Sequence, residues 1–144
     1  MKSLRIAIVG ATGLVGKTML NVLEERNVSI SQLILVASEQ SIGKVIEFQG
    51  ENISIVSLQT ALSKNLDVAI FSAGGEVSRQ WAPQFSDAGV TVIDNSSAWR
   101  MNENIKLIVP EVNGVCMTSR DIIFANPNCT TMQLVMVLKP LHDQ

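Results

Sequence analysis

Short apolar runs rich in isoleucine and valine recur along the chain, with helix-like or turn-like segments between them. The runs do not alternate with polar residues, a pattern typical of strands that are buried on both faces of a parallel sheet. The predicted strands cover residues 4–9, 33–37, 68–71, 90–93, 107–109 and 122–125.

Two helices are predicted between these strands. Residues 14–26 repeat apolar side chains at helical spacing, which gives this helix one apolar side. Residues 76–88 predict a second helix that is interrupted or bent near Pro83 and closed by Gly89. Helices that alternate with strands in this way indicate an α/β fold.

The segment VIEFQGENISIVSL at residues 45–58 breaks this rhythm. Two extended pieces flank residues 50–52, which predicts an antiparallel hairpin added to the sheet. We therefore expect a Rossmann-like, doubly wound and mostly parallel sheet with an inserted antiparallel hairpin. The length of 144 residues is that of one domain.

Composition narrows the classes of function. Hydrophobic residues make up 47% and charged residues 17% of the chain, which predicts a compact folded domain. The net charge of −2, without any basic run, argues against nucleic acid and anionic membranes as partners. No apolar stretch approaches the roughly 20 residues of a membrane helix, and glycines break the apolar patch near the N-terminus that resembles a signal peptide. We expect a cytoplasmic protein, since Cys116 and Cys129 lack metal-site spacing and fit a reducing compartment.

The sequence GATGLVG at residues 10–16 follows the first apolar run directly and opens the first predicted helix. It is a variant of the G-x-G-x-x-G fingerprint. Gly10 would turn the chain off the strand, Gly13 would let backbone N–H groups approach a pyrophosphate, and Gly16 would let the helix pack closely on the sheet. The helix N-terminus directs free N–H groups at the phosphates, and Thr12 adds a hydroxyl. A purely structural turn is the alternative, but the position at the start of a βαβ unit favours dinucleotide binding.

The end of the second predicted strand bears on the choice between NAD and NADP. An acid there binds the ribose 2′-OH of NAD, whereas an arginine accommodates the 2′-phosphate of NADP. Glu39 lies one position past the expected strand end, and Ser38, Ser41 and Lys44 offer an alternative set that could hold a 2′-phosphate. We expect NADP and keep NAD as the alternative.

Cys129 follows Asn-Pro-Asn and precedes an apolar helical pattern, so we expect its thiol in the first turn of a helix. The helix dipole and the free N–H groups there favour the thiolate, which is the nucleophilic form. The same N–H groups, together with the side chain of Asn128, could bind a developing oxyanion. The alternative for a lone cysteine is burial as a small apolar residue.

Cys116 and His142 have no such context. We expect Cys116 to be buried as a small apolar residue. His142, the only histidine, lies near the chain end, and the intervening helix would separate it from Cys129 by about 1.5 Å per residue. We therefore expect an exposed histidine that does not pair with the thiol.

Several segments together resemble the aspartate-β-semialdehyde dehydrogenase family, in the family's order and over the whole chain. They are GATGLVG at 10–16, FSAGGEVS at 71–78, VIDNSSAWRM at 92–101, VPEVN at 109–113 and NPNCTT at 126–131. The related N-acetyl-glutamyl-phosphate reductases carry a Gly-Cys-Tyr-Pro-like turn where this chain has Asn-Cys-Thr-Thr. The resemblance therefore favours the aspartate enzyme.

The resemblance implies an enzyme that reduces aspartyl phosphate to aspartate semialdehyde with NADPH and releases inorganic phosphate. Cys129, beside Asn128, matches the family's nucleophile, which forms a thioester with the acyl group. Arg100 matches its phosphate-binding arginine, with Asn95 and Ser97 around it. Residues 12–15 match the pyrophosphate loop and residues 72–74 the loop beneath the nicotinamide, while glutamine replaces the family's frequent arginine at position 40. The predicted cofactor-binding set is Gly10, Thr12, Gly13, Leu14, Val15, Ser38, Gln40, Ser41, Ser72, Ala73 and Gly74, and no metal site is predicted.

Members of this family are much longer than this chain. Their second domain carries the acid/base histidine, a substrate-orienting glutamine, a carboxylate-binding arginine and most of a dimer interface. We therefore expect residues 1–144 to form a dinucleotide-binding domain that includes the cysteine turn, with the second domain outside this chain and a homodimer for the full-length enzyme. The isolated chain should bind cofactor with negligible turnover. A non-catalytic dinucleotide sensor is the alternative from another class.

Overall fold

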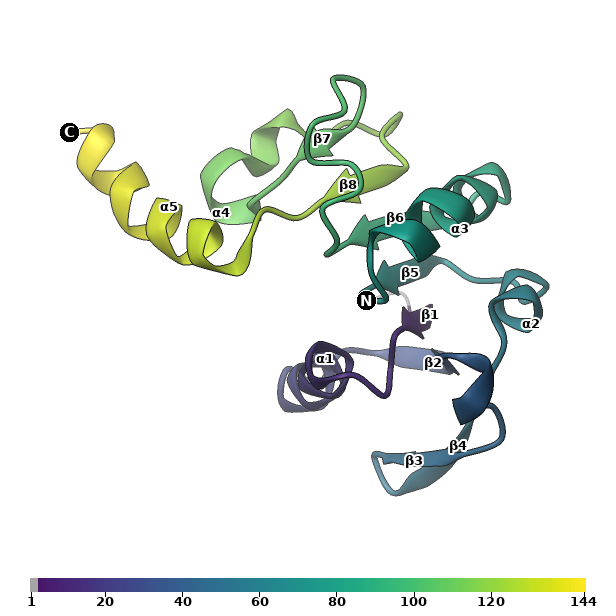
Figure 1. The fold of residues 1–144 in the computed structure, drawn as a ribbon. Helices are drawn as coiled ribbons and strands as arrows, with labels where there is room; N and C mark the ends of the chain where they lie inside the picture. Colours follow the sequence, from purple (N-terminus) through teal and green to yellow (C-terminus); the bar gives the residue numbers. More distant parts are fainter. Residues whose placement is uncertain (1–2) are drawn as a thin grey trace.

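The computed structural model describes residues 3–144, and Figure 1 labels its elements. The strands are β1 Leu4–Val9, β2 Ile30–Val36, β3 Val45–Phe48, β4 Glu51–Val56, β5 Val68–Phe71, β6 Thr91–Asp94, β7 Lys106–Leu107 and β8 Ile123–Ala125. The helices are α1 Leu14–Glu25, α2 Leu58–Leu62, α3 Gly75–Asp87, α4 Pro110–Asn113 and α5 Cys129–His142, with 3-10 turns at Glu39–Ser41 and Gly114–Cys116.

Within residues 3–144 the strands form one eight-stranded sheet in the order β3-β4-β2-β1-β5-β6-β8-β7. Every neighbouring pair is parallel except β3–β4, which is antiparallel. In Figure 1, α1 lies on one side of the sheet, and α2 and α3 lie on the other. The predicted fold class, a doubly wound sheet with an inserted hairpin, is confirmed.

Alternate residues of the central strand β1 face two separate apolar cores. Ile6 and Ile8 pack with Leu20 of α1 in one core, whereas Val9 packs with Ala82 of α3 in the other. All these side chains are buried. Both faces of β1 are thus covered, which explains why its apolar run does not alternate with polar residues. The loop that leaves β1 is consequently anchored on a strand fixed from both sides.

The strand β2 begins three residues before the predicted start at residue 33. Ser31 and Gln32 are exposed polar positions of this strand, so a search for apolar runs misses them. The strand pairs with β4 only over its last residues, Leu35 and Val36, so its first half lies at an open edge where polar side chains are tolerated.

The predicted hairpin forms, but its turn differs from the expectation. Phe48 pairs with Glu51, and the two turn residues are Gln49 and Gly50. Both have positive φ, 52° and 80°, as in the type I′ turn whose twist matches that of the flanking strands. The predicted turn at residues 50–52 is therefore wrong in register, because residues 51 and 52 already belong to β4.

Helix α3 continues through Pro83, so it is not interrupted there, and the alternative of a bend stays a prediction. A proline inside a helix removes one backbone hydrogen bond and costs about 3 kcal/mol. Here Ala82 and Phe85 are fully buried beside it, and the Phe85 ring meets the Phe71 ring edge-on, with 5.4 Å between centroids. Packing against the sheet therefore holds the helix together across the proline.

The short helices α2 and α4 were not predicted, since five and four residues show no clear helical period. Each nevertheless has a start signal. The hydroxyl of Ser57 accepts a hydrogen bond from the Thr60 N–H at the start of α2, and Pro110 occupies the first turn of α4.

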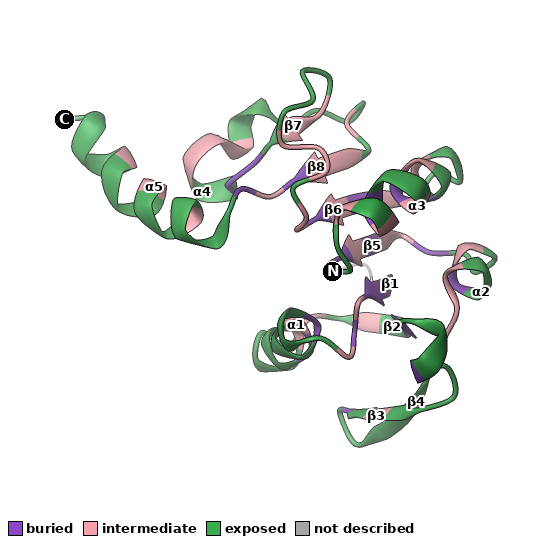
Figure 2. Ribbon diagram, in the orientation of Figure 1, coloured by how far each residue is buried: buried purple, intermediate pink, exposed green. Residues whose placement is uncertain are grey.

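Helix α5 projects from the sheet (Figure 1) and is exposed along most of its length (Figure 2). Its main contacts are with α4. Apolar side chains dominate its exposed surface: Leu134, Met136, Val137, Leu138 and Leu141. A helix that is apolar on several sides is typical of a helix covered by further protein. None of the helices in residues 3–144 combines the length and hydropathy needed to cross a bilayer.

Candidate active site

The two loops that follow β1 and β5 meet at the middle of the sheet. Strand β1 pairs with β2 on one side and with β5 on the other. The chain therefore proceeds outward in opposite directions from this point, which leaves a crevice at the carboxyl ends of the two strands. Ligands of open α/β sheets bind in such a crevice.

Two glycines make the close contacts in this crevice. Gly10 has a φ of +95°, and a Cβ there would lie 2.3 Å from the carbonyl oxygen of Ser72. A Cβ at Gly16 would lie 2.2 Å from the carbonyl oxygen of Gly10. Backbone atoms occupy both spaces, so only glycine fits at either position. The turn off the strand and the close packing of α1 are as predicted.

Gly13 is the N-cap of α1 and places no side chain over the start of the helix. The first helical hydrogen bond runs from the Lys17 N–H to the Gly13 carbonyl. The N–H groups of the intervening first turn have no intrahelical partner. This bare helix N-terminus fits the pyrophosphate of a dinucleotide.

A cavity of about 310 Å³ opens beside this turn. The predicted cofactor residues that line it are Gly10, Thr12, Gly13, Ser38, Ser72 and Ala73. Val36, Leu58 and Val77 add apolar surface, which suits the apolar faces of a nucleotide. The lining does not include the other predicted cofactor residues, Leu14, Val15, Gln40, Ser41 and Gly74.

The residues expected to select the ribose form a 3-10 turn directly after Ser38. Glu39 and Gln40 are exposed there, whereas Ser41 is buried. An acid and a neutral amide therefore share the turn. The predicted contacts of Gln40 and Ser41 with a 2′-phosphate stay predictions.

Helix α5 begins at Cys129, with Asn128 as its N-cap. The Asn128 Oδ1 accepts hydrogen bonds from the backbone N–H of Thr130 at 2.9 Å and from its hydroxyl at 2.7 Å. The Cys129 Sγ lies 3.6 Å from the same oxygen, and the thiol is exposed. The prediction that the thiol lies in the first turn of a helix is confirmed.

Arg100 is held by two backbone carbonyls. Its Nε donates to the Asn126 oxygen at 2.9 Å, and its Nη2 donates to the Asn95 oxygen at 3.0 Å. The other guanidinium N–H groups have no hydrogen-bond partner among the described residues. Because the guanidinium is planar, these two contacts fix its orientation and leave donors free for an oxyanion.

The thiol and the guanidinium line the same cavity of about 200 Å³. Its lining consists of Val15, Ser72, Asn95, Arg100, Pro127, Asn128, Cys129 and Met132. Ser72 also lines the cavity beside the glycine turn, so the two cavities adjoin. The fold thereby brings the predicted nucleophile, the predicted anion-binding arginine and the predicted nicotinamide loop together from distant parts of the sequence.

Three expectations about other residues have different outcomes. Cys116 is exposed, so its predicted burial is wrong. It lies in a surface 3-10 turn after α4, where no apolar layer covers it. His142 is exposed at the far end of α5, as predicted. Ser97 is also exposed, and Ser96 rather than Ser97 anchors the turn beside Arg100, through hydrogen bonds to Asp94.

Sequence reasoning missed two residues that organise the site. Asn126 accepts from Arg100, and its side-chain nitrogen donates to Asn95 Oδ1 at 2.7 Å. Asp94 is a fully buried carboxylate at the end of β6. A charged residue that closes an apolar run was the available signal for Asp94. Asn126 belongs to the Asn-Pro-Asn sequence before Cys129, but nothing in that pattern indicated its contacts with Arg100 and Asn95.

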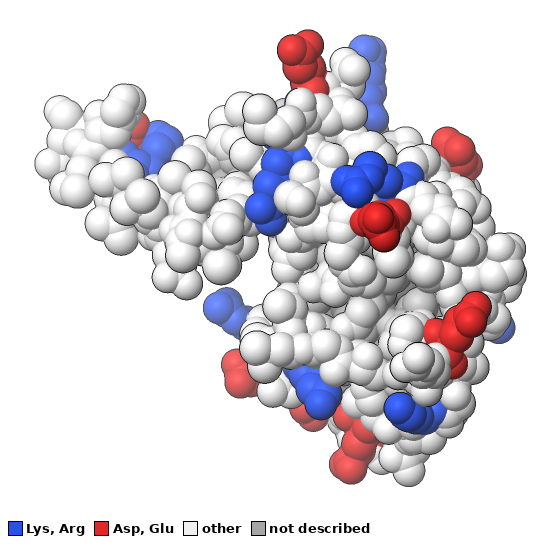
Figure 3. All heavy atoms as spheres, viewed as in Figure 1, with Lys and Arg blue, Asp and Glu red and all other residues white. Residues whose placement is uncertain are grey.

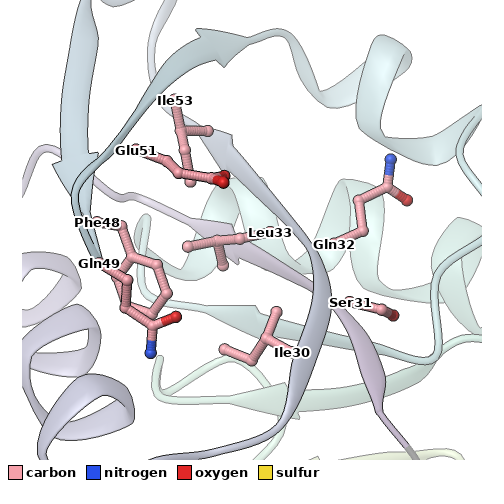
Figure 4. A pocket seen from close by; sticks show the side chains of 8 residues that line it. All are labelled: Ile30, Ser31, Gln32, Leu33, Phe48, Gln49, Glu51 and Ile53. Carbon is pink, nitrogen blue, oxygen red and sulfur yellow. The ribbon is translucent and has the colours of Figure 1, made fainter.

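A larger cavity of about 400 Å³ lies elsewhere, between the first half of β2 and the hairpin (Figure 4). Phe48, Leu33 and Ile53 point into it beside Gln49 and Glu51. It contains no thiol and no cation, so it lacks the chemistry gathered around Cys129. Charged side chains of both signs are scattered over the face in Figure 3. Residues 3–144 contain no group of three or more His, Cys, Asp or Glu side chains placed to hold a metal.

A glycine-lined crevice at the switch point of a doubly wound sheet, next to an exposed thiol and a guanidinium, defines a dinucleotide-binding domain with an adjoining thiol site. The chain belongs to the family described as the NAD-binding domain of semialdehyde dehydrogenase, whose sequence model matches residues 5–118. The cofactor of this class is a nicotinamide dinucleotide.

Proteins similar to this chain are aspartate-semialdehyde dehydrogenases. The chain is 53% identical over 143 residues to the one from Aquifex aeolicus and 50% identical over 145 residues to the one from Corynebacterium glutamicum. The two alignments cover 97% and 96% of this chain but only 42% and 41% of the relatives. The crystal structure of aspartate semialdehyde dehydrogenase II from Vibrio cholerae, complexed with ASA, superimposes with a TM-score of 0.90 at 44% identity, over 99% of this chain and 47% of that one.

Proposed function

We propose that this chain is the cofactor-binding portion of an NADP-dependent aspartate-semialdehyde dehydrogenase, an enzyme of amino-acid biosynthesis. The reaction is the reductive dephosphorylation of aspartyl 4-phosphate to aspartate 4-semialdehyde. The observation that carries the proposal is the cavity in which Cys129, Arg100 and Ser72 meet, directly beside the glycine turn. Its relatives at 53% and 50% identity bear this enzyme's name.

Cys129 is the nucleophile of this proposal. Its thiolate attacks the acyl carbon of aspartyl phosphate, the carbon–oxygen bond to phosphate breaks, and a thioester forms with release of inorganic phosphate. The N–H groups at the start of α5 and the amide nitrogen of Asn128 stabilise the developing oxyanion. A nicotinamide dinucleotide bound in the crevice would supply the hydride that converts the thioester into the aldehyde.

Arg100 binds the departing phosphate. Its Nε and one Nη2 hydrogen are taken up by the carbonyls of Asn126 and Asn95, so the remaining N–H groups can form a fork toward the phosphate oxygens. Asn95 acts through Arg100 and also lines the cavity itself. A fixed fork favours the tetrahedral anion more than a flexible ammonium would.

The crevice binds NADP, with NAD as the alternative. The phosphates would lie on the N-terminus of α1, held by Gly10, Thr12 and Gly13 together with the backbone of residues 14–15. Ser38, Gln40 and Ser41 would face the ribose, and residues 72–74 would lie under the nicotinamide. Since residue 40 is an amide rather than a guanidinium, the preference for NADP over NAD should be weaker than with an arginine there.

The rest of the enzyme would cover α5. The exposed apolar side chains of this helix need a partner, and the chain spans about two fifths of the length of its relatives. A second domain would supply the acid/base group, since His142 is exposed at the far end of α5. The complete cytoplasmic enzyme would be a homodimer whose partners are its small-molecule substrate and inorganic phosphate.

The test uses the two cysteines of the 144-residue chain. Both are exposed, so Cys116 serves as an internal reference for Cys129. Iodoacetamide should alkylate Cys129 faster than Cys116, and inorganic phosphate should slow only Cys129, as measured by peptide mass spectrometry. Arg100→Lys should raise the phosphate concentration for half protection about tenfold or more, because the planar fork is lost. Equal alkylation rates and no phosphate effect would favour a non-catalytic sensor.

Measuring turnover distinguishes aspartate semialdehyde from N-acetyl-glutamate semialdehyde as the substrate. The assay uses a protein in which this chain is followed by the segment that its relatives have beyond the matched region. This protein should reduce NADP in the presence of aspartate semialdehyde and phosphate. N-acetyl-glutamate semialdehyde should be a poor substrate, and a preference for it would contradict the proposal. The 144-residue chain alone should bind NADP with negligible turnover.

A further inference from the structure

A buried carboxylate is hydrogen-bonded to the turn that leads to Arg100. Asp94, the last residue of β6, and Ser78 of α3 are both fully buried. The Asp94 Oδ2 accepts hydrogen bonds from the hydroxyls of Ser78 and Ser96, both at 2.7 Å, and its Oδ1 accepts from the Ser96 N–H at 2.9 Å. The indole N–H of Trp99 donates to the Ser78 oxygen at 2.8 Å. A buried carboxylate is costly unless its oxygens are hydrogen-bonded, so this network strongly favours one arrangement.

The network holds both ends of the turn that carries Arg100. Ser96, near the start of the turn, binds Asp94 directly, and its hydroxyl oxygen accepts from the Ala98 N–H at 3.1 Å. Trp99, at the end of the turn, is tied through Ser78. Arg100 is the next residue, so the hydrogen bonds of Ser96 and Trp99 fix the backbone from which its side chain starts.

The same aspartate also reaches the cysteine turn. The Asn126 N–H donates to the backbone carbonyl of Asp94 at 2.8 Å. The Asn126 carbonyl then accepts from the Arg100 Nε, and its amide binds the side chain of Asn95. Asn126 stands at the start of the Asn-Pro-Asn sequence that leads into Cys129. The turn that carries Arg100 and the turn that leads to Cys129 are therefore both hydrogen-bonded to Asp94.

We propose that Asp94 and Ser78 are positioning residues that orient the Arg100 guanidinium toward the Cys129 cavity, with Asn126 linking the two turns. The role of that cavity as an anion site rests on the proposed function. The positioning itself rests on the hydrogen bonds above. In this role Ser78 makes α3, which lies on the face of the sheet away from α1, a support of the anion site.

Asp94→Asn tests this proposal in the 144-residue chain. An amide can accept with only one of its two polar atoms, and its NH₂ group would face hydroxyls that currently donate. We expect the Arg100 Nε–H and the Trp99 indole N–H to exchange with water at least tenfold faster in NMR measurements. The phosphate concentration that half-protects Cys129 from iodoacetamide should rise about tenfold. Ser78→Ala, which keeps both bonds from Ser96, should shift the same readings in the same direction by less.

Asp67→Asn is the matched control. Asp67 binds Arg5 through a two-pronged contact at the opposite end of the sheet, so it tests the general cost of losing a structural carboxylate. It should lower stability without changing the exchange of Arg100 or the effect of phosphate. Unchanged Arg100 exchange in folded Asp94→Asn or Ser78→Ala would overturn the proposal. If phosphate fails to protect even the unsubstituted chain while Asp94→Asn speeds the exchange, the positioning stands and the proposed function fails.

Discussion

At the scale of single residues, the crevice depends on how closely its backbone segments approach one another. A Cβ at Gly10 or Gly16 would fall within 2.3 Å of a backbone oxygen, so no rotamer change could relieve the contact. A flexible side chain can move aside, whereas these neighbours are backbone atoms of the loops that follow β1 and β5. Glycine at these positions therefore sets the distance between the helix and the sheet.

Gly16→Ala should destabilise the chain by about 1–3 kcal/mol, the usual range for overpacking, although alanine favours helices. NADP affinity should fall with it, since the start of α1 must shift. Gly114→Ala is the control, because a Cβ there would meet nothing closer than 3.7 Å and its φ is −56°. Urea unfolding and titration with NADP measure both quantities. Equal stability of the two variants would contradict the packing argument.

At the scale of elements, the site depends on how turns are tied to helix ends. Asn128 caps α5, and its Oδ1 holds the Thr130 N–H while contacting the thiol. The sequence predicted this helix start because Asn-Pro-Asn before an apolar helical pattern is a local signal. Asp94 also accepts from Ser78 of α3, sixteen residues earlier in the chain, and no local pattern could reveal that partner.

Asn128→Ala should cost about 1 kcal/mol of stability through the lost cap. Asn128→Asp keeps the acceptor and adds a negative charge at a helix N-terminus, so it should preserve stability. The aspartate lacks the amide donor and repels anions, so phosphate should protect its Cys129 far less. Urea unfolding and iodoacetamide kinetics separate the capping role from the anion-binding role. Full phosphate protection in Asn128→Asp would contradict the second role.

The stability of the chain should depend on pH through Asp121, in the loop before β8. The hydrogen bond from the Lys106 ammonium, followed by that from the Thr118 N–H, lowers the pKa of Asp121 from its ordinary value. Because the folded-state pKa is depressed, the ionised carboxylate stabilises the fold above about pH 4, and this contribution is lost as the pH falls through the lower folded-state value. Urea unfolding of the parent chain and of Asp121→Asn should therefore differ near pH 6 and converge toward pH 3. A difference that grows on acidification would contradict the assignment.

At the scale of the whole molecule, the sequence predicted the fold class well, because fully buried parallel strands are continuous apolar runs. The sequence-based predictions failed where exposure or packing overrides the apolar pattern. The polar start of β2 lies at an open sheet edge, and the buried side chains of α3 keep the helix intact at Pro83. The strand order and the meeting of Val15, Arg100 and Cys129 are long-range, so only the family resemblance could anticipate them.

The uncovered α5 predicts self-association of the 144-residue chain. Its exposed apolar side chains, uncharged over most of the projecting end in Figure 3, should drive weak oligomers at high protein concentration. Val137→Lys with Leu141→Lys should return the chain to a monomer in sedimentation velocity. Met101→Lys replaces a side chain in a loop that is even more exposed, and it should leave association unchanged. Identical sedimentation of all three proteins would exclude α5 as the contact.

Because Cys129 is the first residue of α5, the orientation of this helix determines the direction of the thiol. Within residues 3–144 this helix packs mainly against α4, and most of its surface is exposed. A change in the tilt of α5 would redirect the thiol relative to the Arg100 guanidinium. A protein that binds the exposed side chains of α5 would thereby also set the direction of the thiol.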